Sequence, residues 1–153
     1  MNPHLKNLVI YGFLLFSFLG FLDASFLTVE HYRGVIPPCT ITHGCEQVTT
    51  SPYSQIIGIP VALLGALYYL GIFLSIVLYL DIKDERILRV VAYGTITGLL
   101  FSLWFTFLQA FIIRAWCQYC LGSAVTSTML FVVGMIYLRQ RKKSLLERVK
   151  EIL

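Results

Sequence analysis

Long stretches without a charged side chain constrain this chain more than any other feature of its sequence. Three stretches carry no charge and a fourth carries only Asp23: these are 47–80, 90–113, 115–138 and 7–29. Charged residues make up 13% of the chain, against about 25% in soluble domains, and the mean hydropathy is +0.78. A helix needs about 20 apolar residues to cross the hydrocarbon core of a bilayer. The sequence therefore predicts four transmembrane helices, at about 7–29, 56–80, 88–113 and 115–138.

The basic residues predict how these helices are oriented. If both termini lie on one side of the membrane, only Arg33 and Arg114 face the opposite side. The basic residues on the side of the termini are Lys6, Lys83, Arg86, Arg89, Arg139, Arg141, Lys142, Lys143, Arg148 and Lys150. The positive-inside rule makes that side cytoplasmic. The net charge of +4 is then a topology signal, and we expect no nucleic-acid partner.

These features predict a single all-α integral membrane domain over residues 1–153, a four-helix bundle that crosses the cell (inner) membrane several times. Residues 30–57 would form an extracytoplasmic loop after the first helix. The first apolar stretch has no good signal-peptidase site, and its removal would leave an odd number of spans, so we expect it to be retained. Residues 139–153 form a basic cytoplasmic tail, in which Leu145, Leu146, Val149 and Leu153 recur at helical spacing. We expect this tail to lie on the membrane surface.

Four cysteines form two pairs on the predicted extracytoplasmic side. Cys39 and Cys45 lie in the first loop, and Cys117 and Cys120 form a Cys-x-x-Cys at the start of the fourth helix. A helix N-terminus stabilises a thiolate, which is the reactive form of cysteine. The loop pair is in reach of a protein in water, and the helical pair is next to lipid. This arrangement predicts a relay by thiol-disulfide exchange.

Two other interpretations of the cysteines stay open. Both pairs could be inert disulfides that brace a membrane protein without enzymatic activity. His43 lies between Cys39 and Cys45, but that spacing is not a familiar zinc motif, so we expect no metal. Redox behaviour distinguishes the relay from the structural interpretation, because structural disulfides resist mild reduction whereas the disulfides of a relay are reduced and re-formed in each cycle.

Two polar residues near the predicted extracytoplasmic side also have two interpretations each. Asp23 lies inside the first span, where a charge is costly, and is either a proton donor or, as we favour, a polar structural contact. Ser51 precedes Pro52, which is typical of a helix N-cap followed by proline at the first helical position.

At the cysteines and their flanks the chain resembles the vitamin K epoxide reductase (VKOR) family, specifically its prokaryotic members. The matching stretches are 24–32, 45–53, 58–65 and 116–120. The combination is specific: a spaced loop pair, a serine six residues after its second cysteine, and Trp116-Cys-Gln-Tyr-Cys120 opening the fourth span. The resemblance extends from about residue 8 to residue 137.

The resemblance implies a four-helix bundle around a quinone, ubiquinone or menaquinone, which accepts the electrons. Cys39 would then exchange with a partner dithiol, Cys45 would pass electrons to Cys117, and Cys120 would lie nearest the quinone. Ser51 would hydrogen-bond the quinone carbonyl. This role is the alternative to its interpretation as a helix N-cap. Tyr53 and Phe111 are expected as walls of the quinone pocket.

The partner implied by the resemblance is a thioredoxin-like, DsbA-type protein, so the activity would support disulfide formation outside the cytoplasm. Many prokaryotic members carry a fused thioredoxin-like domain, whereas here we expect a separate partner protein. The animal enzymes have a tyrosine four residues after the last active cysteine, where this chain has Ala124, so epoxide reduction is not expected. A DsbB-type oxidase would carry its Cys-x-x-Cys in the first loop, the reverse of the order found here.

Overall fold

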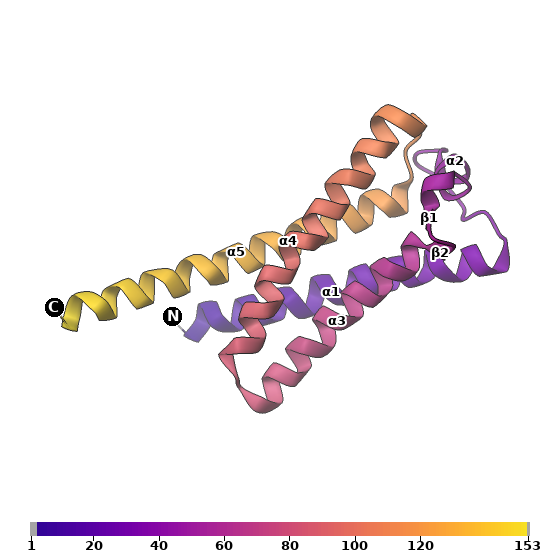
Figure 1. Cartoon of the computed structure of the whole chain (residues 1–153). Helices are drawn as coiled ribbons and strands as arrows, with labels where there is room; N and C mark the ends of the chain where they lie inside the picture. Colours follow the sequence, from indigo (N-terminus) through magenta and orange to yellow (C-terminus); the bar gives the residue numbers. More distant parts are fainter. Residues whose placement is uncertain (1–2, 153) are drawn as a thin grey trace.

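The computed structural model describes residues 3–152 (Figure 1). Its long helices are α1 (Pro3–Arg33), α3 (Val61–Ile82), α4 (Glu85–Phe107) and α5 (Gln118–Ile152), and α4 continues into a π-helix, η2 (Leu108–Ile113). Within the described residues, four helical segments are long and apolar enough to cross a membrane. The predicted class, a four-helix membrane bundle with a cysteine-containing loop after its first helix, is confirmed.

Short elements fill the connection between α1 and α3. They are α2 (Cys45–Thr49), the 3-10 helix η1 (Pro52–Ser54), and the strands β1 (Gln55–Ile56) and β2 (Ile59–Pro60). The strands pair antiparallel, Gln55 with Pro60 and Ile56 with Ile59. Ile57 and Gly58 form the two-residue turn of this hairpin, with φ of 53° and 79°. Positive φ at both positions is what a type I′ hairpin turn requires.

This hairpin corrects the predicted start of the second helix. The helix was expected from about residue 56, with a restart near residues 58–60; residues 55–60 are hairpin, and α3 begins at Val61, directly after the expected restart. Hydropathy alone does not separate apolar strand residues such as Ile56 and Ile59 from apolar helix residues.

The other predicted helix bounds also shift. The first helix runs from Pro3 to Arg33 rather than over 7–29, because polar residues extend it beyond the apolar stretch at both ends. The third begins at Glu85, where the Asp84 side chain accepts a hydrogen bond from the Arg86 N–H at 2.8 Å and caps the helix. The fourth begins at Gln118 rather than at residue 115, after a left-handed turn at Arg114 with φ of 55°.

The bundle is built around α1, which packs against both α3 and α5, and α4 packs mainly against α5. Phe13 of α1, Ile76 of α3 and Leu130 of α5 are fully buried in the shared core. At the α1–α3 crossing, Gly20 faces the Tyr69 ring, and a Cβ at Gly20 would collide with that ring. Glycine here allows the two helices to approach closely.

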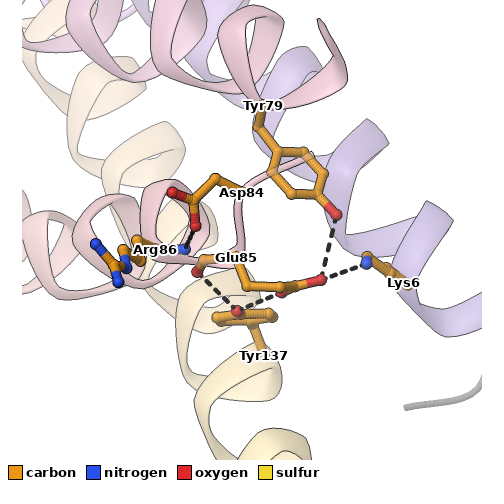
Figure 2. A network of polar contacts seen from close by, with 6 residues as sticks. All are labelled: Lys6, Tyr79, Asp84, Glu85, Arg86 and Tyr137. Atoms are coloured by element: carbon orange, nitrogen blue, oxygen red, sulfur yellow. Dashed lines mark hydrogen bonds and ion pairs between the residues drawn. The ribbon is translucent and has the colours of Figure 1, made fainter. Parts of the chain in front are cut away.

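A polar cluster joins all four long helices at the end of the bundle opposite the cysteine loop (Figure 2). Glu85 at the start of α4 forms an ion pair with Lys6 of α1. Its carboxylate also accepts hydrogen bonds from Tyr79 of α3 at 3.4 Å and from Tyr137 of α5 at 2.9 Å. We refer to Lys6, Tyr79, Glu85 and Tyr137 as the far-end cluster.

Helix α5 continues far beyond the rest of the bundle (Figure 1). Its 35 residues correspond to about 52 Å at 1.5 Å per residue, whereas the hydrocarbon core of a bilayer is about 30 Å thick. No glycine or proline interrupts residues 139–152, so the tail continues the spanning helix in line. The placement of this tail on the membrane surface stays a prediction, and Leu153 of that prediction lies outside the described residues.

Candidate active site

The loop pair forms a disulfide, and its two cysteines differ in exposure. The Cα atoms of Cys39 and Cys45 are 5.9 Å apart. Cys45 opens α2 and is completely buried, whereas Cys39 lies in the loop and is half-buried. The Cys39 sulfur lies 3.6 Å from the Thr42 hydroxyl. Of the two sulfurs, Cys39 is therefore the one that a second protein can reach.

The helical pair consists of two free thiols, Cys117 and Cys120. Cys117 directly precedes α5, and Cys120 lies in the first turn of that helix. The Cys120 thiol donates a hydrogen bond to the Cys117 sulfur and, with the backbone N–H groups of Cys120 and Tyr119, lowers the pKa of Cys117 to about 7 despite its burial. A substantial fraction of Cys117 is therefore thiolate near neutral pH.

The fold brings the two pairs into one cluster. Buried Cys45 and Cys117 belong to one cluster with Val48 of α2 and Ala115, and the partly buried Cys39 and Cys120 pack against it. The loop backbone packs directly on the turn before α5, since a Cβ at Gly44 would lie 2.7 Å from the Trp116 carbonyl oxygen. Glycine at this position allows α2 to sit against Cys117, so the loop pair contacts the helical pair.

Two side chains inside the Cys-x-x-Cys hold the loop in this position. Gln118 accepts a hydrogen bond from the Ile41 backbone N–H at 3.1 Å, and its amide nitrogen donates to the Pro38 carbonyl at 3.3 Å. The Tyr119 hydroxyl donates to the same carbonyl at 3.0 Å. The residues between the helical cysteines therefore dock the segment that carries Cys39, a role that their spacing alone did not reveal.

A buried glutamine holds the turn that carries Cys117. Gln109 is 2% exposed, and its side-chain oxygen accepts a hydrogen bond from the Cys117 backbone N–H at 2.9 Å. Its own carbonyl accepts a hydrogen bond from the Ala115 N–H at 3.2 Å. Sequence reasoning missed Gln109, although a lone amide in the apolar stretch 90–113, shortly before a reactive cysteine, was a usable signal.

A cavity of about 690 Å³ lies beneath the hairpin, bounded by α1, α3, α4 and α5. Among the cysteines of the described chain, Cys120 is the one that lines it. The wall is mainly apolar, with a few polar groups. Among the described residues, three of these polar side chains have a buried oxygen without a hydrogen-bond partner: Asp23, Tyr68 and Ser127.

Of the three residues predicted to contact the quinone, one lines the cavity and two do not. Ser51 lines the cavity, and its hydroxyl donates to the Val48 carbonyl at 2.8 Å instead of accepting from a backbone N–H as a helix cap would. Tyr53 and Phe111 are not among the lining residues within the described chain. The Tyr53 side chain is 45% exposed, and Phe111 is 67% exposed and packs on Phe107 with ring centroids 5.0 Å apart.

Fold and site together define a multi-pass membrane thiol oxidoreductase, with an outer disulfide that contacts an inner dithiol at the edge of a cavity. A sequence model of the Vitamin K epoxide reductase family matches residues 12–135. Because this match spans well over half of the chain, the protein belongs to that family, whose members are quinone-reducing thiol oxidoreductases.

Proposed function

We propose that this protein generates disulfide bonds outside the cytoplasm, taking electrons from a separate thioredoxin-like, DsbA-type partner and passing them to a membrane quinone. The observation that carries the proposal is the contiguous cluster of four cysteines between a loop surface and a cavity in the bundle. Inert disulfide braces need neither two cysteine pairs packed in one cluster nor a cysteine in the wall of a cavity.

The loop pair performs the first exchange. A thiolate of the partner attacks the half-buried Cys39, the Cys39–Cys45 bond breaks, and the resolving thiol of the partner then displaces Cys39. The partner leaves with a disulfide, and the protein holds two loop thiols in its place. Cys45, packed with Cys117, is placed for the next exchange.

The helical pair performs the second exchange. When Cys117 and Cys120 are disulfide-bonded, the Cys45 thiolate attacks Cys117, and Cys120 leaves as a thiolate. Cys39 then attacks Cys45, which restores the loop disulfide and leaves Cys117 and Cys120 reduced. The lowered pKa of Cys117 makes it a good leaving group in this last step.

The cavity suits a quinone in size and lining. Its volume lies within the range of about 300–1,000 Å³ that is typical of small-molecule sites, and its wall is mainly apolar. Quinone carbonyls accept hydrogen bonds, and the unpartnered Tyr68 hydroxyl would hold one of them. The Ser51 hydroxyl would have to leave the Val48 carbonyl to hold another. When bound, ubiquinone or menaquinone supplies an acceptor for two electrons and two protons.

The orientation in the membrane follows from the same proposal. Both described ends of the chain lie at the end of the bundle opposite the cysteine loop (Figure 1). The excess of basic residues at that end supports cytoplasmic termini, with the cysteines facing the extracytoplasmic side of a prokaryotic cell membrane. Labelling Cys39 in the Cys45→Ala variant of intact cells, with a membrane-impermeant thiol reagent, tests this placement.

Anaerobic single turnover tests the reaction. The purified protein in detergent is mixed with a reduced thioredoxin-like protein and a soluble short-chain quinone, and both partner thiols and quinone are followed. We expect a stoichiometric loss of both, which Cys120→Ala abolishes. The control is Ser75→Ala, which removes an exposed α3 hydroxyl bonded only to its own helix.

The partial reactions show where the relay stops. In Cys120→Ala the loop pair should still exchange with the partner, while quinone stays unreduced. Full disulfide-forming activity in Cys117→Ala, or wild-type protein that leaves the partner reduced and the quinone unchanged, would rule out the relay.

A further inference from the structure

Asp23 places a carboxyl group in the cavity wall, inside the first membrane-spanning helix. Its Oδ2 atom is buried and has no hydrogen-bond partner among the described residues. Neither ion pair found in the described chain includes it. A carboxyl buried at membrane depth is costly unless it is paired, so a purely structural polar contact is a poor account of this residue.

The carboxyl lies against the start of α5, next to the helical cysteines. A Cβ at Gly122, two residues after Cys120, would lie 3.8 Å from Asp23 Oδ1. The Asp23 carboxyl therefore lies close to the first turns of α5. Asp23 is within electrostatic range of both the Cys117 and the Cys120 sulfurs.

The titratable groups around Asp23 leave it without a cationic partner. From α3 it faces Tyr68 and Tyr69, and from the α5 side it faces Cys117 and Cys120. The Tyr69 hydroxyl donates to the Ser123 carbonyl at 2.8 Å, so its proton is engaged elsewhere. His31, farther along α1, lines the same cavity, and its Nε2 atom lies 3.2 Å from the Gln55 amide nitrogen. Helix α4 contributes no titratable side chain to the cavity wall within the described residues.

We propose that Asp23 is the proton carrier of the quinone-reducing step, an inference that rests on the function proposed above. As the bond between Cys117 and Cys120 forms, the dithiol gives up two electrons and two protons, and the quinone takes up both and becomes a quinol. The Asp23 carboxylate accepts a proton from each breaking S–H bond in turn and releases it into the cavity. It ends the cycle in the ionisation state in which it began.

The first test needs no quinone. The alkylation of Cys120 by a small uncharged reagent is measured against pH in wild-type protein and in Asp23→Asn. A negative charge beside a thiol disfavours the thiolate, so Asp23→Asn should move the profile to lower pH and raise the rate at a fixed pH about threefold or more. The control, Asp81→Asn, makes the same chemical change at the exposed far end of α3 and should leave the profile unchanged.

The second test separates the proton step from binding. In anaerobic turnover with a short-chain quinone, Asp23→Asn should lower kcat about a hundredfold with little change in KM, a loss typical of removing a general acid-base group. The fall of the wild-type rate toward low pH, where the carboxylate is lost, should be absent in the variant. Asp23→Glu keeps a carboxyl and should retain at least about a tenth of the wild-type rate.

The outcomes distinguish this inference from the proposed function. If wild-type protein reduces no quinone, the proposed function fails. If wild-type protein reduces quinone and Asp23→Asn matches its kcat and pH profile, only the role of Asp23 is overturned. Exchange of the loop disulfide with a reduced thioredoxin-like protein reports on folding and should stay at the wild-type rate. If Asp23→Asn loses this exchange, the variant is misfolded and Asp23→Glu is used in its place. An Asp23→Glu protein that keeps the loop exchange but reduces quinone about a hundredfold more slowly than wild type would overturn the role of the carboxyl group.

Discussion

At the scale of single residues, the site depends on small differences in burial and hydrogen bonding between similar groups. Cys39 and Cys45 share a disulfide, yet Cys39 is half-buried and Cys45 is completely buried. Cys117 receives a hydrogen bond from the Cys120 thiol and is more acidic than an ordinary thiol. In the proposed relay these differences set the direction of exchange, from the more accessible Cys39 sulfur toward the cavity.

The hydrogen bond to Cys117 leads to a prediction about pH. Because Cys120 is the largest cause of the lowered pKa, Cys120→Ala should move the Cys117 titration upward, toward the usual range of a thiol. Thiolate absorbance in the ultraviolet, followed against pH, measures this shift. In wild-type protein the thiolate should form at about pH 7 and disappear as the pH falls below that value.

Two observations complete this test. The Ser75→Ala protein should titrate like the wild type, because this side chain lies outside the cysteine cluster. An unchanged midpoint in Cys120→Ala would show that the helix N-terminus alone, and not the neighbouring thiol, acidifies Cys117.

At the scale of elements, two short irregular segments align the cysteine pairs. The π-helix η2 ends α4 with Gln109 buried, and the turn that follows carries Cys117. The five-residue helix α2 brings Cys45 against that turn. Irregular π segments inside helices are frequent at functional sites, and here the segment supplies the acceptor for the Cys117 N–H.

Replacing Gln109 with leucine should disturb this alignment. The substitution leaves the buried Cys117 N–H without its acceptor, at a cost of about 1–3 kcal/mol in the free energy of unfolding. We expect slower exchange between the loop pair and the helical pair, measured by rapid-quench trapping of the mixed disulfide between Cys45 and Cys117. Exchange of Cys39 with the partner should keep its rate.

The matched control for this change is Gln140→Leu, which makes the same substitution in the α5 tail, away from the cysteines. If Gln109→Leu loses the expected stability but forms the mixed disulfide at the wild-type rate, Gln109 has a purely structural role.

At the scale of the whole molecule, stability and chemistry are placed at opposite ends of the bundle. The far-end cluster ties all four long helices together through the Glu85 carboxylate (Figure 2). The cysteines and the cavity lie at the other end, where the loop packs on α5. We therefore expect the far-end cluster to stabilise the bundle without taking part in electron transfer.

Glu85→Gln should weaken the bundle without slowing the reaction. It removes an ion pair and weakens two hydrogen bonds to a partly exposed carboxylate, so we expect a loss of about 1 kcal/mol. For a chain of this size that loss lowers Tm by about 3 °C, measured by thermal unfolding in detergent. Glu147→Gln, in the exposed tail, should leave Tm unchanged. A large fall in the quinone-reduction rate of Glu85→Gln at a temperature where it is folded would contradict this separation.

The sequence by itself determined the four membrane spans and the positions of the two cysteine pairs next to those spans, and it predicts their orientation. These follow from local composition, because a bilayer demands about 20 apolar residues per crossing whatever the rest of the chain does. The hairpin at 55–60 escaped this reasoning, because short apolar strands and helix ends have the same composition.

Only the tertiary structure decided which groups meet. The packing of Cys45 and Cys117 in one buried cluster requires a glycine at position 44 to fit against Trp116, and it joins segments about 70 residues apart in the sequence. The unpartnered oxygens of Asp23 and Tyr68 became apparent only when four helices enclosed a cavity around them. Hydropathy is additive along a chain and can be read locally, whereas contacts between helices depend on how whole surfaces fit together.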